Sequence, residues 1–161
     1  MKILGLDPGI ATTGFGLIEV DFKCPPRLLD YGIIQTDKDL PIGARLAVLY
    51  ADMETILTKG KPTIVSLEKL FFYRMGNLIP VAQARGVILL ALAQQQIIPR
   101  EYSPPQVKLA LTGYGKASKG EVQEAVVREL NLDRIPRPDD CADALAIALT
   151  CWFSSTASAP L

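Results

Sequence analysis

Two short apolar runs in this chain each end on an acidic residue, and they constrain its fold more than any other feature. Residues 3–6 are followed by Asp7 and a Pro-Gly turn, and the partly β-branched run at residues 63–67 leads in the same way to Glu68. Both runs predict buried strands. A carboxylate at the end of a buried strand costs free energy unless its charge is compensated, so the chain must supply a compensating group for both acids.

The remaining pattern predicts a mixed α/β fold. The first three strands are expected at residues 3–7, 14–20 and 28–36, with a break at Cys-Pro-Pro before the third, and their closeness favours an antiparallel meander. Helices are then expected at 41–59, 78–96, 104–112, from 118 or 119 to about 130, and from 139 or 140 to about 153. Two more strands are expected at 63–67 and 97–102. This order indicates a mixed sheet with helices on both faces.

Three of the expected helices have distinctive features. Ser103 is a suitable cap for the helix that begins with Pro104. Small alanines at positions 142, 144 and 146 would let the last helix approach a sheet closely. The helix at 78–96 is apolar nearly all round, so it is either central to the core or shared with a second subunit.

The composition excludes several classes of chemistry. Histidine is absent, so reactions near neutral pH must use carboxylates, lysines, thiols or a metal ion. Cys24, Cys141 and Cys151 form no C-x-x-C pair, and they indicate a reduced, cytoplasmic protein. The longest apolar run, residues 86–93, is much shorter than the roughly 18 residues of a membrane span. We therefore expect no membrane segment and no secretion leader.

Charge is unevenly distributed along the chain, although the formal net charge is zero. Residues 69–119 contain seven lysines or arginines and a single acid, Glu101, so the rest of the chain is acidic. A basic face would suit a polyanion such as nucleic acid. Folding could equally mix these charges into an ordinary surface, and charge alone favours neither reading.

Four acids form the candidate site: two at strand ends, Asp7 and Glu68, and two at the start of the last helix, Asp140 and Asp143. Their i, i+3 spacing puts the two aspartates on one helix face. Each acid also has an ordinary reading as a turn residue, a helix cap or, for Glu68, the ion-pair partner of Arg85. Together, however, four carboxylates would repel one another unless a hard divalent cation, Mg²⁺ or Mn²⁺, neutralised them.

Five segments, in order along nearly the whole chain, resemble the RuvC family of Holliday-junction resolvases. Three of them are the D-P-G after the first strand, the E-x-x-F that begins at Glu68, and the Q-A-R-G at residues 83–86. The other two are residues 102–123, which contain Q-V-K and G-x-G-x-A-x-K, and the D-x-x-D-A-L-A helix at 140–146.

The resemblance implies an RNase H-like fold with a mixed five-stranded sheet and a homodimeric, Mg²⁺-dependent endonuclease. Such an enzyme resolves four-way junction DNA by paired symmetric nicks in recombination and repair. The implied cofactor is Mg²⁺, with Mn²⁺ as a substitute and two ions in each active site. RuvA–RuvB is the implied partner that hands over the junction.

The resemblance also assigns roles to individual residues. Catalysis and metal binding fall on Asp7, Glu68, Asp140 and Asp143, and DNA contacts fall on Lys108 and Lys119. The aromatic residue beside the junction falls on Phe71, although Phe72 or Tyr73 could serve instead. Some members carry histidine at the third acid. Here Asp139 competes with Asp140 for that place, and the D-x-x-D spacing favours Asp140.

A four-way junction has two equivalent strands to nick, which calls for two active sites related by a twofold axis. The helix at 78–96 is the candidate dimer surface, with Val87, Leu90, Ala91 and Gln94 on one stripe. Either that stripe or its opposite would face the partner. The whole nuclease domain is expected to span residues 1–154, followed by a flexible tail at 155–161.

Three rival functions share parts of this pattern. A sugar-kinase or actin-type ATPase begins a lobe similarly, but it needs a second such lobe. A relative that processes RNA or acts in general repair would use the same acids, and a junction-binding protein without nuclease activity would not need them. Gly9, Gly14 and Gly16 could let the backbone pass close to DNA or could be turn and bulge residues.

Overall fold

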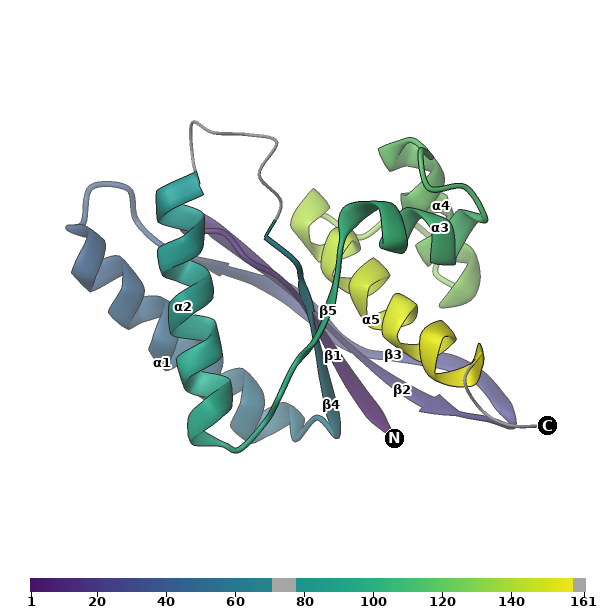
Figure 1. The fold of residues 1–161 in the computed structure, drawn as a ribbon, viewed down its shortest axis with the longest axis horizontal. Coiled ribbons are helices and arrows are strands. Elements are labelled where there is room, and N and C mark those ends of the chain that lie inside the picture. Colours follow the sequence, from purple (N-terminus) through teal and green to yellow (C-terminus); the bar gives the residue numbers. More distant parts are fainter. Residues whose placement is uncertain (71–77, 158–161) are drawn as a thin grey trace.

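A mixed five-stranded sheet lies between two layers of helices in the computed structural model, which describes residues 1–70 and 78–157 (Figure 1). The strands are β1 (Lys2–Asp7), β2 (Thr12–Asp21), β3 (Cys24–Gln35), β4 (Ile64–Glu68) and β5 (Arg100–Tyr102). The helices are α1 (Ile42–Gly60), α2 (Leu78–Gln94), α3 (Pro104–Thr112), α4 (Lys119–Glu129) and α5 (Asp139–Ala157).

The strand order is β3-β2-β1-β4-β5. β1, β2 and β3 form the expected antiparallel meander, whereas β4 and β5 add to β1 in parallel. The mixed sheet with helices on both faces is therefore confirmed. Because β1 and β4 are parallel neighbours, their carboxyl ends lie at the same end of the sheet, and each of these ends carries an acid.

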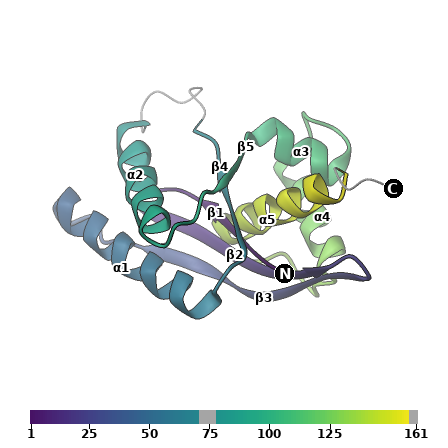
Figure 2. The same cartoon turned by 60° about the horizontal axis from the view of Figure 1, so that its bottom comes forward.

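Alternation along the strands divides the core into two halves. Leu4 and Leu6 point to the side covered by α1 and α2, while Ile3 packs with α3, α4 and α5 on the other side. Figure 2 shows these two helix layers on either side of the sheet. Odd-numbered positions of β1 therefore face α5, and Asp7 belongs to this set.

Helix α5 packs close to the sheet because glycines line the strands beneath it. A Cβ added to Gly5 would lie 2.0 Å from the Ala144 carbonyl oxygen, and one added to Gly14 would lie 2.1 Å from that of Asp140. Gly14 and Gly16 thus make room for α5. The sequence predicts that these glycines let the backbone approach DNA or form turns and bulges, and it does not predict this packing role. Gly9 does occupy the turn, where it exchanges hydrogen bonds with the Thr13 hydroxyl.

Several element boundaries differ from the sequence expectation. β3 begins at Cys24 and includes both prolines, because it is an edge strand and needs no ladder partner on its outer side. β5 has three residues rather than six, and α2 ends at Gln94. α5 continues to Ala157, so residues 155–157 of the expected tail are helical, and residues 158–161 lie outside the described part.

The stripe that the sequence predicted on α2, which includes Leu90 and Ala91, does not lie on a single face of the helix. Ala91 is fully buried against the sheet, whereas Leu90 is 52% exposed and Ile79 is 73% exposed. Gly86, between them on the outer side, has open space where a side chain would be. The outward side of α2 is thus apolar and distinct from its core side. Within the described residues, no helix is long and apolar enough to span a membrane.

Candidate active site

Three separate elements bring the four predicted acids together. Asp7 and Glu68 directly follow the paired residues Leu6 and Leu67 of β1 and β4, and strand alternation turns both acids toward α5. Asp7 is paired with Gly14 on β2, and the backbone of Asp140 lies directly over that glycine. The close approach of α5 therefore brings its first turns, with Asp140 and Asp143, beside Asp7.

The carboxyl groups of the site have raised pKa values, so a nearby positive charge would stabilise their ionised forms. Burial raises the pKa of Asp7 well above its ordinary value, and the charge of Glu68, a hydrogen bond between the two carboxyls, and Asp143 and Asp140 raise it further. Burial also raises the pKa of Glu68, although the same hydrogen bond opposes this. The charges of the neighbouring carboxylates thus disfavour the ionisation of Asp7.

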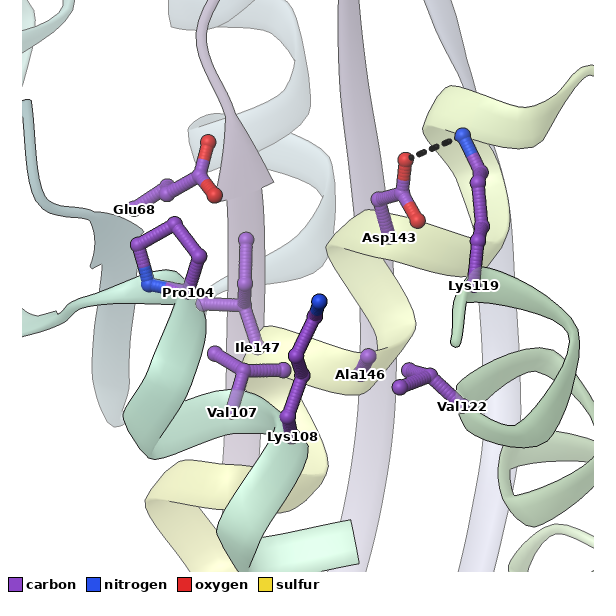
Figure 3. Close-up of a pocket in the computed structure, with 9 residues that line it drawn as sticks. All are labelled: Glu68, Pro104, Val107, Lys108, Lys119, Val122, Asp143, Ala146 and Ile147. Atoms are coloured by element: carbon purple, nitrogen blue, oxygen red, sulfur yellow. Dashed lines mark hydrogen bonds and ion pairs between the residues drawn. The ribbon is translucent and has the colours of Figure 1, made fainter. Parts of the chain in front are cut away.

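Lys119 is the cation in contact with this cluster. Its ammonium nitrogen lies 3.0 Å from Asp143 Oδ2 (Figure 3). The same nitrogen lies 3.2 Å from Asp139 Oδ2. Burial raises the pKa of Asp143, and the hydrogen bond from Lys119 offsets part of that rise. Asp139 behaves differently, because its hydrogen bond with Lys119 lowers its pKa, and Arg137 and Gln123 lower it further.

These contacts distinguish the two adjacent aspartates. The charge of Asp140 contributes to the raised pKa of Asp7, which places Asp140 toward the carboxylate cluster. Asp139 forms surface ion pairs with Lys119 and Arg137 instead. Both aspartates raise the pKa of Asp143 through their charges, so the choice of Asp140 as the third acid stays a prediction based on the D-x-x-D spacing.

A cleft of about 380 Å³ opens beside the acids. Glu68 and Asp143 stand at its far side, and the Lys108 side chain points up toward the gap between them (Figure 3). The rest of the lining is Lys119 and an apolar group: Pro104, Val107, Val122, Ala146 and Ile147. The cleft thus combines cations suited to phosphate with an apolar floor.

Helix capping fixes where the two lysines lie. Ser103 and Gln106 form a capping box at the start of α3, with Pro104 at the first helical position as expected. Ser118 and Glu121 form a second box, which makes Lys119 the first residue of α4. Lys108 and Lys119 therefore project from two defined helices into one cleft.

The sequence matches the family model described as crossover junction endodeoxyribonuclease RuvC over residues 3–151. The chain belongs to the RuvC family. A RuvC protein of Gloeobacter violaceus is 57% identical over 153 residues, which is 95% of this chain and 88% of that protein.

Solved structures agree with this assignment. The Thermus thermophilus RuvC structure superposes with a TM-score of 0.91 at 38% identity, covering 98% of this chain and 96% of that one. The same organism's RuvC in complex with a Holliday junction substrate has a TM-score of 0.89 at 34% identity, covering 98% and 97%. The expected RuvC membership and RNase H-like fold are thereby confirmed, and the ATPase alternative is excluded.

Two sequence-based assignments have a different outcome. Phe71, Phe72 and Tyr73 lie outside the described residues, so the aromatic assignment stays a prediction. Arg85 does not pair with the Glu68 carboxylate. Its guanidinium donates to the Glu68 main-chain carbonyl at 2.8 Å and pairs with Glu101 at 2.8 Å. Glu101 is the single acid among the basic residues 69–119, and this isolation is the sequence signal that could have indicated an ion pair there.

The donor chemistry of this RuvC site fits a hard divalent cation. All four acids offer carboxylate oxygens, and burial raises the pKa of three of them, a condition that a bound cation would relieve. Among the described residues, no three acidic, cysteine or histidine side chains converge closely enough to hold one ion. Metal binding would therefore require these side chains to rearrange. RuvC nucleases are divalent-metal dependent as a family.

Proposed function

We propose that this RuvC-family nuclease resolves four-way junctions by paired symmetric nicks, with Mg²⁺ bound by Asp7, Glu68, Asp140 and Asp143. The proposal rests on the gathering of four carboxylates from β1, β4 and α5 at one end of the sheet, next to a cleft that Lys108 and Lys119 line. When bound, Mg²⁺ or Mn²⁺, with two ions in each site, would supply a water-derived nucleophile and stabilise the leaving oxygen of the phosphodiester.

The protein's own groups would position the DNA strand. Lys108 and Lys119 lie at the cleft and suit the binding of phosphates that flank the scissile bond. Lys119 now pairs with Asp143; if Asp143 held a metal ion, the lysine would be available to contact phosphate at the rim of the cleft. Phe71 is proposed to support the opened bases at the junction centre.

A homodimer would provide the two active sites that paired nicking needs. Ile79 and Leu90 are exposed on the outward side of α2, and Gly86 would allow close approach of a second copy. A twofold contact between two α2 helices uses this same surface on both chains. RuvA–RuvB is proposed as the assembly that delivers the junction, in the cytoplasm.

Cleavage of synthetic substrates tests the function directly. The full chain is incubated in Mg²⁺ with a labelled four-way junction, a linear duplex of the same sequence and an RNA–DNA hybrid. We expect the junction alone to be cut, at symmetric positions on opposing strands. Preferential cutting of the hybrid would support the RNA-processing alternative, and tight junction binding without cutting would support the binding-protein alternative.

A further inference from the structure

Arg85 links the backbone of a proposed metal ligand to two other elements. This residue lies on α2, and its side chain is only 12% exposed. One terminal nitrogen of its guanidinium donates to the main-chain carbonyl of Glu68 at 2.8 Å. The other pairs with Glu101 on β5, also at 2.8 Å. Three elements are therefore joined where β4 ends.

Glu68 is the last residue of β4, so the position of its side chain depends on the contacts that hold the end of this strand. β4 is held at this end by the β5 ladder, in which Glu68 is paired with Tyr102, and by the hydrogen bond from the Lys69 amide to the Tyr102 carbonyl. A buried cation fixed on the Glu68 carbonyl adds a third restraint at the residue itself.

We propose that the Arg85–Glu101 pair is a clamp that positions the Glu68 carboxylate for metal binding. Arg85 is thus a positioning residue that acts through the backbone of Glu68, without touching the metal or the DNA. The inference rests on the proposed function, because it assigns Glu68 as a ligand. It also gives α2 a second role beside the proposed dimer contact.

The chemistry of the clamp requires arginine. The planar fork of a guanidinium reaches a carboxylate and a carbonyl at once with fixed geometry, whereas a lysine ammonium is a single point charge on a flexible stem. Partners that orient metal ligands in this way typically change metal affinity or activity by about 10–100-fold when they are altered. Arg85→Lys should therefore keep the buried positive charge but not the fixed geometry.

Arg128 on α4 provides a control with similar partners, although its side chain is 65% exposed. It makes the same two kinds of contact, an ion pair with Glu129 at 2.9 Å and a hydrogen bond to the Leu111 carbonyl at 3.4 Å. Neither partner is among the proposed metal ligands or the cleft residues. Arg128→Lys thus reports the general effect of weakening an arginine clamp.

Two measurements on the full chain test the proposal. The first is the rise in melting temperature produced by Mn²⁺ alone, without DNA, and the second is the Mg²⁺ concentration for half-maximal junction cutting. For Arg85→Lys we expect a smaller Mn²⁺-induced rise and a midpoint shifted upward by about tenfold or more, with junction affinity in EDTA unchanged. Arg128→Lys should behave as the wild type in both.

A purely structural role would give a different result. Arg85→Lys would then melt at a lower temperature while the Mg²⁺ midpoint and the Mn²⁺-induced rise stayed at their wild-type values, and this would overturn the proposal. If Arg85→Lys does not fold, Glu101→Gln is tested in its place, because it keeps the guanidinium and weakens the ion pair with residue 101. An unchanged Mg²⁺ concentration for half-maximal cutting in that variant would also overturn the proposal. The Mn²⁺-induced rise needs no substrate, so it tests Arg85 even if wild-type protein fails to cut junctions.

Discussion

Lys119 places its ammonium nitrogen 3.0 Å from a carboxylate oxygen of Asp143, at the mouth of the acidic cluster. Burial lowers the pKa of this lysine, but its hydrogen bonds to Asp143 and Asp139 outweigh that effect and raise it. Lys119 therefore neutralises part of the charge that a divalent cation would neutralise. It also stays close enough to the cleft to meet a phosphate, so one side chain can serve the empty and the DNA-bound enzyme.

Removing any one of the four proposed ligands should stop cutting and spare binding. Asp7→Asn, Glu68→Gln, Asp140→Asn and Asp143→Asn are each expected to lower the cleavage rate by about 100-fold or more. Junction affinity should survive, because it arises chiefly from phosphate contacts. Asp139→Asn is the control, since its ion pairs are exposed and it should cut nearly normally. Any ligand variant that cut at the wild-type rate would lose its assigned role.

Lys108→Ala and Lys119→Ala should weaken junction binding and make it less sensitive to salt. For each phosphate that is no longer neutralised by a lysine, the slope of log affinity against log salt should become shallower by roughly one unit. Binding titrations from low to moderate salt give this slope. Arg27→Ala is the control, because Arg27 pairs with Glu19 on the β2–β3 hairpin. Unchanged slopes for both lysine variants would show that the cleft does not face DNA.

Asp7→Asn should stabilise the metal-free protein at neutral pH. Burial and the neighbouring Glu68 raise the folded-state pKa of Asp7, so the folded protein binds a proton more tightly than the unfolded chain. Wild-type stability therefore falls as pH rises from about 4, the ordinary carboxyl pKa, through the raised folded value. Asp7→Asn has no ionisable group at this position, so its stability does not fall with pH for this reason.

Thermal unfolding in EDTA between pH 4 and pH 8 measures this effect of Asp7→Asn. Each kcal/mol gained corresponds to about 2–4 °C in a chain of this size. The gain should be largest at the neutral end and vanish toward pH 4. Asp52→Asn, an exposed acid on α1, should show no such trend. A melting temperature for Asp7→Asn at or below that of the wild type at pH 7 would contradict the assigned burial cost.

Leu90→Glu should convert the proposed dimer into a monomer that still folds. Leu90 is exposed on the outward side of α2, so a charge there costs the isolated chain little but would be buried at a twofold contact. Sedimentation and light scattering give the oligomeric state, and junction assays should show single nicks without coupled resolution. Thr55→Glu, an exposed change on α1, is the control. Wild-type protein that stays monomeric on junction DNA would remove the paired-nick mechanism.

Gly5→Ala should destabilise the fold strongly. The added Cβ would lie 2.0 Å from the Ala144 carbonyl oxygen, so α5 would have to move away from the sheet. Overpacking of this kind costs about 1–3 kcal/mol or more, and it would also displace Asp140 and Asp143. Gly43→Ala in α1 meets open space and should be neutral or stabilising, by up to about 1 kcal/mol. Chemical denaturation compares the two variants.

Features that depend on near neighbours could be predicted from the sequence. The strands that end on Asp7 and Glu68, the Ser103 cap, and the i, i+3 pair on α5 follow from local pattern and spacing. The family resemblance added the roles of the acids and lysines. The break expected at Cys-Pro-Pro was wrong because a proline's effect on a strand depends on whether the strand lies at the sheet edge, which is a tertiary property.

The sequence by itself determined which side chains could form the site, and the tertiary structure decided which partner each one has. Glu68 and Asp7 are separated by about sixty residues, and only the parallel pairing of β1 with β4 brings them into contact. The position of Asp140 over Gly14 depends on the close packing of α5, and the pairing of Arg85 with Glu101 depends on the β4–β5 register. Local pattern does not encode such contacts, because strand register and helix packing are set by the whole core at once.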